Sequence, residues 1–300
     1  MSMVRNSEIT PFQAWLLAIR PRTLPAAVSP VAVGTALAVS DGVFAPLPAA
    51  AALVGAVLIQ VGANLTNDYF DYVNGVDTPE RQGPQRAAQS GLIALPRLRL
   101  GITVVFAITV LVGAYLISIG GWPILAIGLA SLLSSLAYTG GPIPIGYYGL
   151  GDLFVFLFFG VAAVSGTFYV QALSISLMPV VASIPVGMLT VAILVVNNLR
   201  DIKTDQQTGK RTLAVMIGPK ASRLEYTILL AVAYTVPTLL WLSGKSSAWV
   251  LLPWLSMPLA VRLVHDIHRH DEGPSLNRAL AATARLDLIF CTLFAAGLLL

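Results

Sequence analysis

The 300-residue chain carries 18 Lys and Arg, 14 Asp and Glu and 3 His, for a formal net charge of +4. Only 11% of its residues are charged and 56% are hydrophobic, whereas a soluble domain has about 25% charged residues. The mean hydropathy is +0.80. With a single cysteine, Cys291, this composition excludes a disordered chain, a disulfide-rich scaffold, a cysteine-rich metal site and nearly every soluble enzyme. The sequence therefore predicts an integral membrane protein.

Nine apolar runs have the length expected of membrane-spanning helices. A helix rises ~1.5 Å per residue and needs ~20 mostly apolar residues to cross the hydrocarbon layer. In chain order, the predicted spans lie near residues 20–40, 47–70, 100–119, 123–139, 151–173, 178–199, 224–243, 247–264 and 285–300. We therefore expect one all-α domain over residues 1–300, with nine transmembrane helices around a central cavity that opens to the cytoplasmic side.

The distribution of cations supports nine spans. With an odd number of spans, the N-terminus and the loops after the even-numbered spans lie on one side. Of the 18 lysines and arginines, only Lys245 lies on the opposite side. By the positive-inside rule, the cation-rich side is cytoplasmic. We expect a multi-pass protein of the cell membrane whose N-terminus and active-site loops are cytoplasmic.

Acidic and amide side chains gather at the ends of the second and sixth predicted spans. Residues three or four apart share one face of a helix. Each span end therefore presents one stripe of carboxylates and amides. The stripes are Asn64, Asp68 and Asp71 on the second span and Asn197, Asp201 and Asp205 on the sixth.

Carboxylates at the edge of the hydrocarbon need a compensating cation. An ionised Asp in a spanning helix costs at least ~2.5–3.5 kcal/mol, and neighbouring carboxylates repel each other. Mg²⁺ prefers oxygen ligands and shares them with substrate phosphates. Any one of these aspartates is explained equally well by a solvated helix end, but two similar stripes on separate spans favour a metal–diphosphate site. The predicted metal ligands are Asp68, Asp71, Asp201 and Asp205.

The two aspartate motifs and the nine-helix layout resemble the UbiA superfamily of intramembrane prenyltransferases. Within it, the branch acting on 1,4-dihydroxy-2-naphthoate is the most similar. Four further stretches carry this likeness. They are Arg20 to Pro25, Asp77 through Arg86 to Leu92, Tyr138 to Asp152, and Asp201 to Leu213.

The resemblance implies a Mg²⁺-dependent aromatic prenyltransferase of menaquinone synthesis. Such an enzyme transfers a polyprenyl group from polyprenyl diphosphate to 1,4-dihydroxy-2-naphthoate, with loss of CO₂ and diphosphate, and gives demethylmenaquinol. Metal and basic residues would stabilise the leaving diphosphate, while closure of the site would protect the allylic cation from water. The expected partners are these two substrates and the lipid bilayer, and no nucleic acid.

Supporting roles follow for residues near the motifs. Asn64, Asn67 and Asn197 are expected to support the metal ligands. Cations near the motifs are candidates for binding the diphosphate, with solvated loop residues as the alternative; they are Arg86, Lys203, Lys210 and Arg211. Asp77 lies off the i+3/i+4 ladder of its span, so its ligation stays open.

Three other residues have two possible explanations each. Arg20 is a candidate for the substrate carboxylate or the diphosphate, or else a positive-inside anchor. Tyr138 is a candidate to stabilise the carbocation through its ring, or else an interfacial tyrosine. Asp152 has an active-site role or is a helix cap.

Other functions remain as alternatives. Inside the superfamily, acceptors such as 4-hydroxybenzoate are possible. A transporter with an acidic cation site is the alternative from another class, although such sites tend to lie at the membrane midplane. His265, His268 and His270 lie in a polar stretch that we interpret as a cytoplasmic linker rather than a metal site.

Overall fold

The computed structural model describes residues 9–77, 82–142 and 144–300, and these fold into helices without a β-strand. The α-helices are α1 (Pro11–Ile19), α2 (Pro25–Ser40), α3 (Pro46–Val73), α4 (Leu95–Gly120), α5 (Trp122–Ala137), α6 (Gly151–Val155), α7 (Ala163–Ala172), α8 (Leu177–Gln207), α9 (Leu213–Leu242), α10 (Met257–Arg269) and α11 (Gly273–Leu299). The 3₁₀ segments are η2 (Pro21–Thr23), η3 (Ile145–Tyr147) and η5 (Ala248–Ser256), and η4 (Phe156–Ala162) is a π-helix. Two cations of the predicted cytoplasmic side, Arg5 and Arg81, lie outside the described residues.

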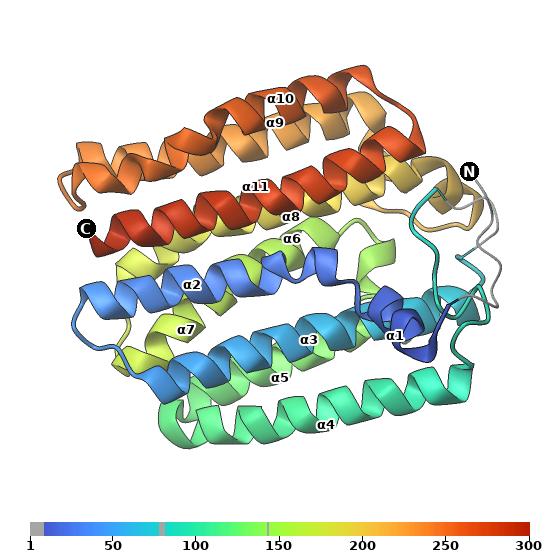
Figure 1. The fold of residues 1–300 in the computed structure, drawn as a ribbon, viewed down its shortest axis with the longest axis horizontal. Coiled ribbons are helices and arrows are strands. Elements are labelled where there is room, and N and C mark those ends of the chain that lie inside the picture. Colours follow the sequence, from blue (N-terminus) through green and yellow to red (C-terminus); the bar gives the residue numbers. More distant parts are fainter. Residues whose placement is uncertain (1–8, 78–81, 143) are drawn as a thin grey trace.

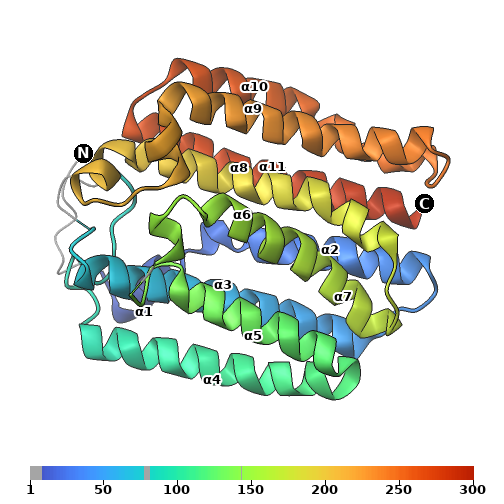
Figure 2. The same ribbon diagram turned by 180° about the vertical axis from the view of Figure 1, so that it is seen from behind.

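The long helices run side by side in one bundle (Figure 1). α8 and α11 lie in the middle, with α9 and α10 on one side and α3, α4 and α5 on the other (Figures 1 and 2). The connections after α3, α5, α8 and α10 gather at one end, which we call the loop end. Lys245 lies in the connection after α9, at the opposite end. The bundle therefore reproduces the separation of Lys245 from the other described cations.

Among the described residues, seven helical units are long and apolar enough to cross a membrane. They are α3, α4, the α6–η4–α7 unit, α8, α9, the η5–α10 unit and α11. The pair formed by Pro11–Thr23 and Pro25–Ser40, bent by 48°, makes an eighth if it is one span. α5 has only 16 residues and falls short of the required length. The protein is thus an all-helical, multi-pass membrane protein, and the ninth span remains a prediction.

Several helices extend beyond the predicted apolar runs at the loop end. α11 begins at Gly273 instead of near residue 285. α9 begins at Leu213 instead of near residue 224, and it is kinked at Gly218, whose backbone is not helical. The hydroxyl of Thr212 caps α9 by accepting a hydrogen bond from the amide of Val215. Hydropathy detects only the part of a helix that lies in hydrocarbon, so the polar first turns of α11 lie outside the predicted run. The same effect extends α3 and α8, whose last turns carry the two polar stripes.

Packing places α8 at the centre of the molecule. In its apolar segment, 72% of the residues are buried inside the protein, compared with 6% for α4. Gly160 on η4 and Gly187 on α8 allow a close approach of the two helices, because a Cβ added at Gly160 would lie 2.8 Å from the Cα of Gly187. Small residues at such contacts let helix backbones pack closely in a membrane protein. α8, which carries the second polar stripe, is therefore held in place by the helices packed around it.

Candidate active site

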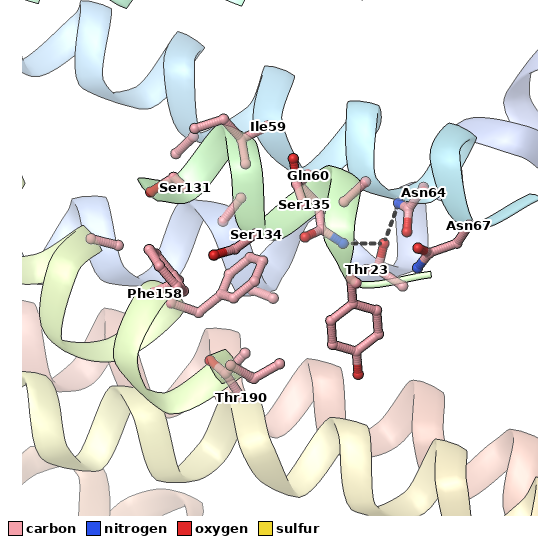
Figure 3. A pocket seen from close by; sticks show the side chains of 18 of the residues that line it. Thr23, Ile59, Gln60, Asn64, Asn67, Ser131, Ser134, Ser135, Phe158 and Thr190 are labelled. Atoms are coloured by element: carbon pink, nitrogen blue, oxygen red, sulfur yellow. Dashed lines mark hydrogen bonds between the residues drawn. The ribbon is translucent and has the colours of Figure 1, made fainter. Parts of the chain in front are cut away.

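A cavity of about 780 Å³ lies within the bundle and extends to the loop end. This volume is in the range of small-molecule sites. Its lining includes apolar side chains of α4, α5 and η4 and polar side chains of η2, α3 and α8. In Figure 3, Gln60, Asn64 and Asn67 lie along one helix, with Phe158 and Thr190 across the cavity. The cavity therefore joins a polar region to an apolar chamber.

The carboxylates of the polar stripe on α3 are buried and accept hydrogen bonds. Asp71, which is 3% exposed, accepts hydrogen bonds from Arg86 Nη2 and from the Tyr147 hydroxyl, both over 2.9 Å. Asp77 Oδ2 lies 3.4 Å from Arg86 Nε. Asp68 accepts the backbone amides of Ala87 and Ala88 over 3.1 and 3.3 Å. The carboxylates of α3 thus hold the segment between α3 and α4 against the cavity, with Arg86 in its lining.

The stripe on α8 is organised by basic side chains. Asp201 Oδ1 accepts a hydrogen bond from Arg200 Nε over 2.8 Å, and Asn197 Oδ1 accepts one from Arg200 Nη2 over 2.8 Å. Asp205 Oδ1 lies 4.0 Å from Lys210 Nζ. Both aspartates are buried. Like Asp71 on α3, each of these two carboxylates has a cation beside it.

Tyr147 on η3 connects the two stripes. Its hydroxyl donates to Asp71 on α3, while Lys210 Nζ lies 5.1 Å from the centroid of its ring in a cation–π contact. Lys210 in turn faces Asp205 on α8. The Tyr147 carbonyl accepts the backbone amide of Arg211 over 3.1 Å, which ties η3 to the connection after α8. The two acid-bearing helix ends therefore meet across one tyrosine.

Two of the tyrosines in the segment after α5, Tyr138 and Tyr147, are held as neutral phenols. Burial is the main cause that raises the pKa of Tyr138 well above its usual value, and the charges of Asp152, Asp71 and Asp205 add to it. Burial is also the main cause that raises the pKa of Tyr147 above its usual value, and the charge of Asp71 is the next cause. Tyr138 lines the cavity, and the charges that raise its pKa include carboxylates from both stripes. The Tyr147 phenol thus donates a hydrogen bond to a carboxylate, and the Tyr138 phenol lies among the charges of three carboxylates.

A cluster around Thr23 holds the start of the chain against α3. The Thr23 hydroxyl accepts hydrogen bonds from Gln60 Nε2 over 3.1 Å and Asn64 Nδ2 over 2.9 Å (Figure 3), and it donates to the carbonyl of Arg20. Arg20 has a φ of 55°, in the left-handed region that non-glycine residues rarely adopt. Such backbone strain persists only where surrounding contacts hold it. The cluster keeps Arg20 at the cavity.

The structure brings together part of the predicted set of site residues. Eight of them line the cavity: Arg20, Asn64, Asn67, Asp71, Arg86, Tyr138, Asn197 and Lys210. Asp68, Asp201 and Asp205 are buried behind this lining. Lys203 and Arg211 are exposed, and Asp152 is half-buried at the start of α6; none of the three contributes to the lining. Lys203 follows Asp201 by two positions, and positions i and i+2 face different ways on a helix.

Five residues of the site were not predicted from the sequence: Thr23, Gln60, Tyr147, Arg200 and Asn277. Gln60 had a detectable signal, because it precedes Asn64 by four positions on the same helix face. The others become recognisable only through partners distant in the chain. Tyr147, for instance, is 76 positions from Asp71.

The donor set at the cavity fits a magnesium ion shared with a ligand. Among the described residues, no three acidic, histidine or cysteine side chains converge into a complete metal site. Mg²⁺ rarely needs such a cage, since it commonly takes one or two carboxylates and substrate phosphate oxygens. Asp71 and Asp205 each supply a carboxylate near Tyr147, and each already faces a basic side chain. The arrangement suits a phosphorylated ligand that brings its own oxygens.

The histidine stretch lies on α10, away from the cavity lining. His268 Nε2 lies 3.1 Å from the Thr227 hydroxyl, and His270 Nδ1 lies 2.9 Å from the Asp266 carbonyl. His265 is exposed. The interpretation of this stretch as a linker is wrong for His265 and His268, because both lie on α10, which extends to Arg269.

Known proteins match nearly the whole chain in sequence. A model of the UbiA prenyltransferase family matches residues 27–293. The 1,4-dihydroxy-2-naphthoate octaprenyltransferase of Escherichia coli (strain K12) is 36% identical, and the match covers 98% of each chain. The enzyme of that name from Bacillus subtilis (strain 168) is 33% identical, over 94% of this chain and 90% of the relative.

Two solved structures share the fold at low identity. The apo structure of a UbiA homolog from Aeropyrum pernix K1 matches with a TM-score of 0.71 and 16% identity, over 93% of this chain and 98% of that one. A UbiA homolog from Archaeoglobus fulgidus bound to GPP and Mg²⁺ matches with a TM-score of 0.66 and 15% identity, over 95% and 99%.

Proposed function

Because this chain belongs to the UbiA prenyltransferase family, we propose that it transfers a polyprenyl group from polyprenyl diphosphate to 1,4-dihydroxy-2-naphthoate. CO₂ and diphosphate leave, and the product is demethylmenaquinol, in the pathway to menaquinone. The relatives that carry this activity in their names match nearly the whole chain. The observation that carries the proposal is the chain of contacts from Asp71 through Tyr147 and Lys210 to Asp205, beside a cavity with an apolar chamber.

The polar end of the cavity is assigned to the diphosphate. Mg²⁺ held by Asp71 and Asp205, with Asp68 and Asp201 as the other ligands expected from the motifs, would neutralise the leaving group. Arg86 and Lys210 line the cavity beside these acids and can bind phosphate oxygens directly. Positive charge placed where negative charge develops lowers the barrier to breaking the C–O bond.

The apolar chamber is assigned to the isoprenoid chain. Side chains of α4, α5 and η4 form its walls, and small residues such as Gly113 and Gly128 leave it open. An allylic cation reacts with water, so a lining that excludes water protects the transfer. Tyr138 lines the same cavity, and its ring can stabilise positive charge there.

The aromatic acceptor is assigned to the region near Arg20. The guanidinium of Arg20 suits the acceptor carboxylate, which it can bind with two parallel hydrogen bonds. The ring carbon that bears this carboxylate attacks the allylic carbon. A C–C bond forms there, the bond to the carboxylate breaks, and its electron pair restores the ring as CO₂ leaves.

The membrane topology follows the same proposal. We infer nine spans in the cell membrane, with α5 as a short span and the bent pair before Ser40 as one span. The loop end, which carries nearly all described cations, is then cytoplasmic by the positive-inside rule. Diphosphate and dihydroxynaphthoate would meet the enzyme at this surface.

The stoichiometry of CO₂ release tests this function. Membranes containing the protein are incubated with a prenyl diphosphate, Mg²⁺ and dihydroxynaphthoate labelled in its carboxyl carbon. We expect one labelled CO₂ for each prenylated product. Prenylated product that retains the label would contradict attack at the carboxyl-bearing carbon, and absence of product would contradict the function itself.

A further inference from the structure

Arg200 occupies a central position in the polar end of the cavity. It lies between Asn197 and Asp201 on α8, and its side chain is only 1% exposed. Its guanidinium donates through Nε to Asp201 Oδ1, through Nη2 to Asn197 Oδ1 and through Nη1 to Asn277 Oδ1, each over 2.8 Å. One buried group thus binds two residues of its own helix and one residue of α11.

The contact with Asn277 extends this network to the segment after α3. Asn277 Nδ2 donates to the carbonyl of Gln82 over 2.9 Å. Gly273, at the start of α11, lies directly against the Gln82 side chain. Gln82 precedes Arg86 by four residues, and Arg86 pairs with Asp71. A continuous path of polar contacts therefore runs from Asp201 through Arg200 and Asn277 to the segment that carries Arg86.

The geometry requires a guanidinium. Adjacent residues on a helix do not face each other, so Arg200 reaches Asp201 and Asn197 only because its planar fork offers several donors in fixed directions. A lysine at this position would keep the charge and three donors, but those donors share one nitrogen, so it could not reach three partners that lie around a planar fork. The orientations of Asp201 and Asn197 are therefore set relative to each other by one rigid group.

We propose that Arg200 is a positioning residue for the diphosphate end of the reaction, and that Asn277 couples it to the Arg86 segment. This rests on the proposed function, because it assigns the task of the same site. Arg200 orients Asp201 and Asn197, while Asn277 keeps the segment of Arg86 at a fixed distance from α8. Partners that orient metal ligands typically contribute 10–100-fold to metal affinity or activity.

The test compares Arg200→Lys and Asn277→Ala with a matched control, Arg223→Lys. Arg223 is also largely buried and donates Nε to a backbone carbonyl, that of Ile267 over 2.8 Å, but it joins α9 to α10 outside the cavity lining. Two quantities are measured on detergent-solubilised protein. One is the rise in unfolding temperature produced by Mg²⁺ with inorganic pyrophosphate, and the other is steady-state transfer.

For Arg200→Lys we expect a roughly ten-fold or greater increase in the pyrophosphate concentration that gives half of the thermal shift. The KM for the prenyl diphosphate should rise, while the KM for dihydroxynaphthoate changes less than about two-fold. Asn277→Ala should change the same quantities in the same direction by a smaller factor. Arg223→Lys should lower the unfolding temperature without moving the pyrophosphate midpoint.

A purely structural role would give a different pattern. If Arg200→Lys lowers the unfolding temperature but keeps the wild-type pyrophosphate midpoint and KM values, the positioning role is contradicted. Equal shifts of the midpoint in Arg200→Lys and Arg223→Lys would contradict it as well. If wild-type protein binds pyrophosphate with Mg²⁺ but does not prenylate dihydroxynaphthoate, the proposed function fails while the thermal-shift comparison still tests Arg200.

Discussion

The hydroxyl of Tyr147 donates a hydrogen bond to Asp71 Oδ1 over 2.9 Å, across 76 positions of the chain. The same ring lies under the ammonium group of Lys210, which faces Asp205. One tyrosine therefore sets the separation between the acid-bearing ends of α3 and α8. A diphosphate bound by both ends depends on this separation, so small changes at Tyr147 should affect the transfer reaction.

Replacement of Tyr147 by Phe separates its two contacts. Phe keeps the ring beneath Lys210 but removes the hydrogen bond to Asp71, and a bond to a charged group is worth ~1.5–3 kcal/mol. We expect transfer to fall roughly ten-fold, the equivalent of about 1.4 kcal/mol, and Tyr147→Ala to lose more. Specific activity of purified variants measures this. Wild-type activity in Tyr147→Phe, or equal losses in both variants, would contradict the bridging role.

The stability of the protein should depend on pH through the same phenol. Burial and the charge of Asp71 raise the pKa of Tyr147 above its usual value of 10.0, so the folded protein keeps a proton that the unfolded chain loses. The stabilisation is fully present below about pH 10 and is lost as the pH rises further. The unfolding temperature of the wild type should therefore fall more steeply above pH 10 than that of Tyr147→Phe. Parallel curves for the two proteins would contradict this assignment.

The fold and one half of the site follow from the sequence by simple rules. Hydropathy located the apolar part of every long helix, and the i+3/i+4 rule predicted the two polar stripes because such neighbours share a face. Applied to Lys203, two positions after Asp201, the same rule would have removed it from the site. Arg211 lies beyond the last residue of α8, where a helical register no longer holds.

The other half of the site depends on contacts between distant segments. Tyr147 lies in a Gly- and Pro-rich connection whose conformation has no periodicity to read, and its function depends on residues of α3 and of the connection after α8. Arg200 reaches Asn277 across 77 positions. The length of α11 also depends on how far the helix extends past the hydrocarbon, which composition alone does not specify.

Carboxylates of both stripes should be needed for transfer. Asp71→Asn and Asp205→Asn each remove a negative charge that holds Mg²⁺, and we expect a hundred-fold or greater loss of activity, about 2.7 kcal/mol. Asp41→Asn is the matched control, because Asp41 is exposed at the end of the bundle opposite the loop end. Activity should be unchanged in that variant. Near-normal transfer by either stripe variant would overturn its metal assignment.

The apolar chamber should determine which prenyl chains fit. Gly128 on α5 shares a helix face with Ile124, Ser131 and Ser135, all of which line the cavity, and a Cβ added at Gly128 meets no atom within 4 Å. Gly128→Leu should therefore fold normally, accept a short prenyl diphosphate and lose activity with a long one.

Gly128→Ala serves as the graded control for this prediction. It should keep activity with both chain lengths and raise stability by about 1 kcal/mol, because glycine disfavours a helix interior. Competition between farnesyl and octaprenyl diphosphate measures the preference of each variant. An unchanged preference in Gly128→Leu would contradict the assignment of the chamber to the isoprenoid chain.

The choice of aromatic acceptor distinguishes the proposed reaction from other prenyl transfers. Purified protein is given octaprenyl diphosphate with either 1,4-dihydroxy-2-naphthoate or 4-hydroxybenzoate, in Mg²⁺ or in excess chelator, and products are identified by mass. We expect decarboxylated, prenylated naphthoquinol only with dihydroxynaphthoate and Mg²⁺. Turnover of 4-hydroxybenzoate at a comparable rate, or of dihydroxynaphthoate in chelator, would contradict it.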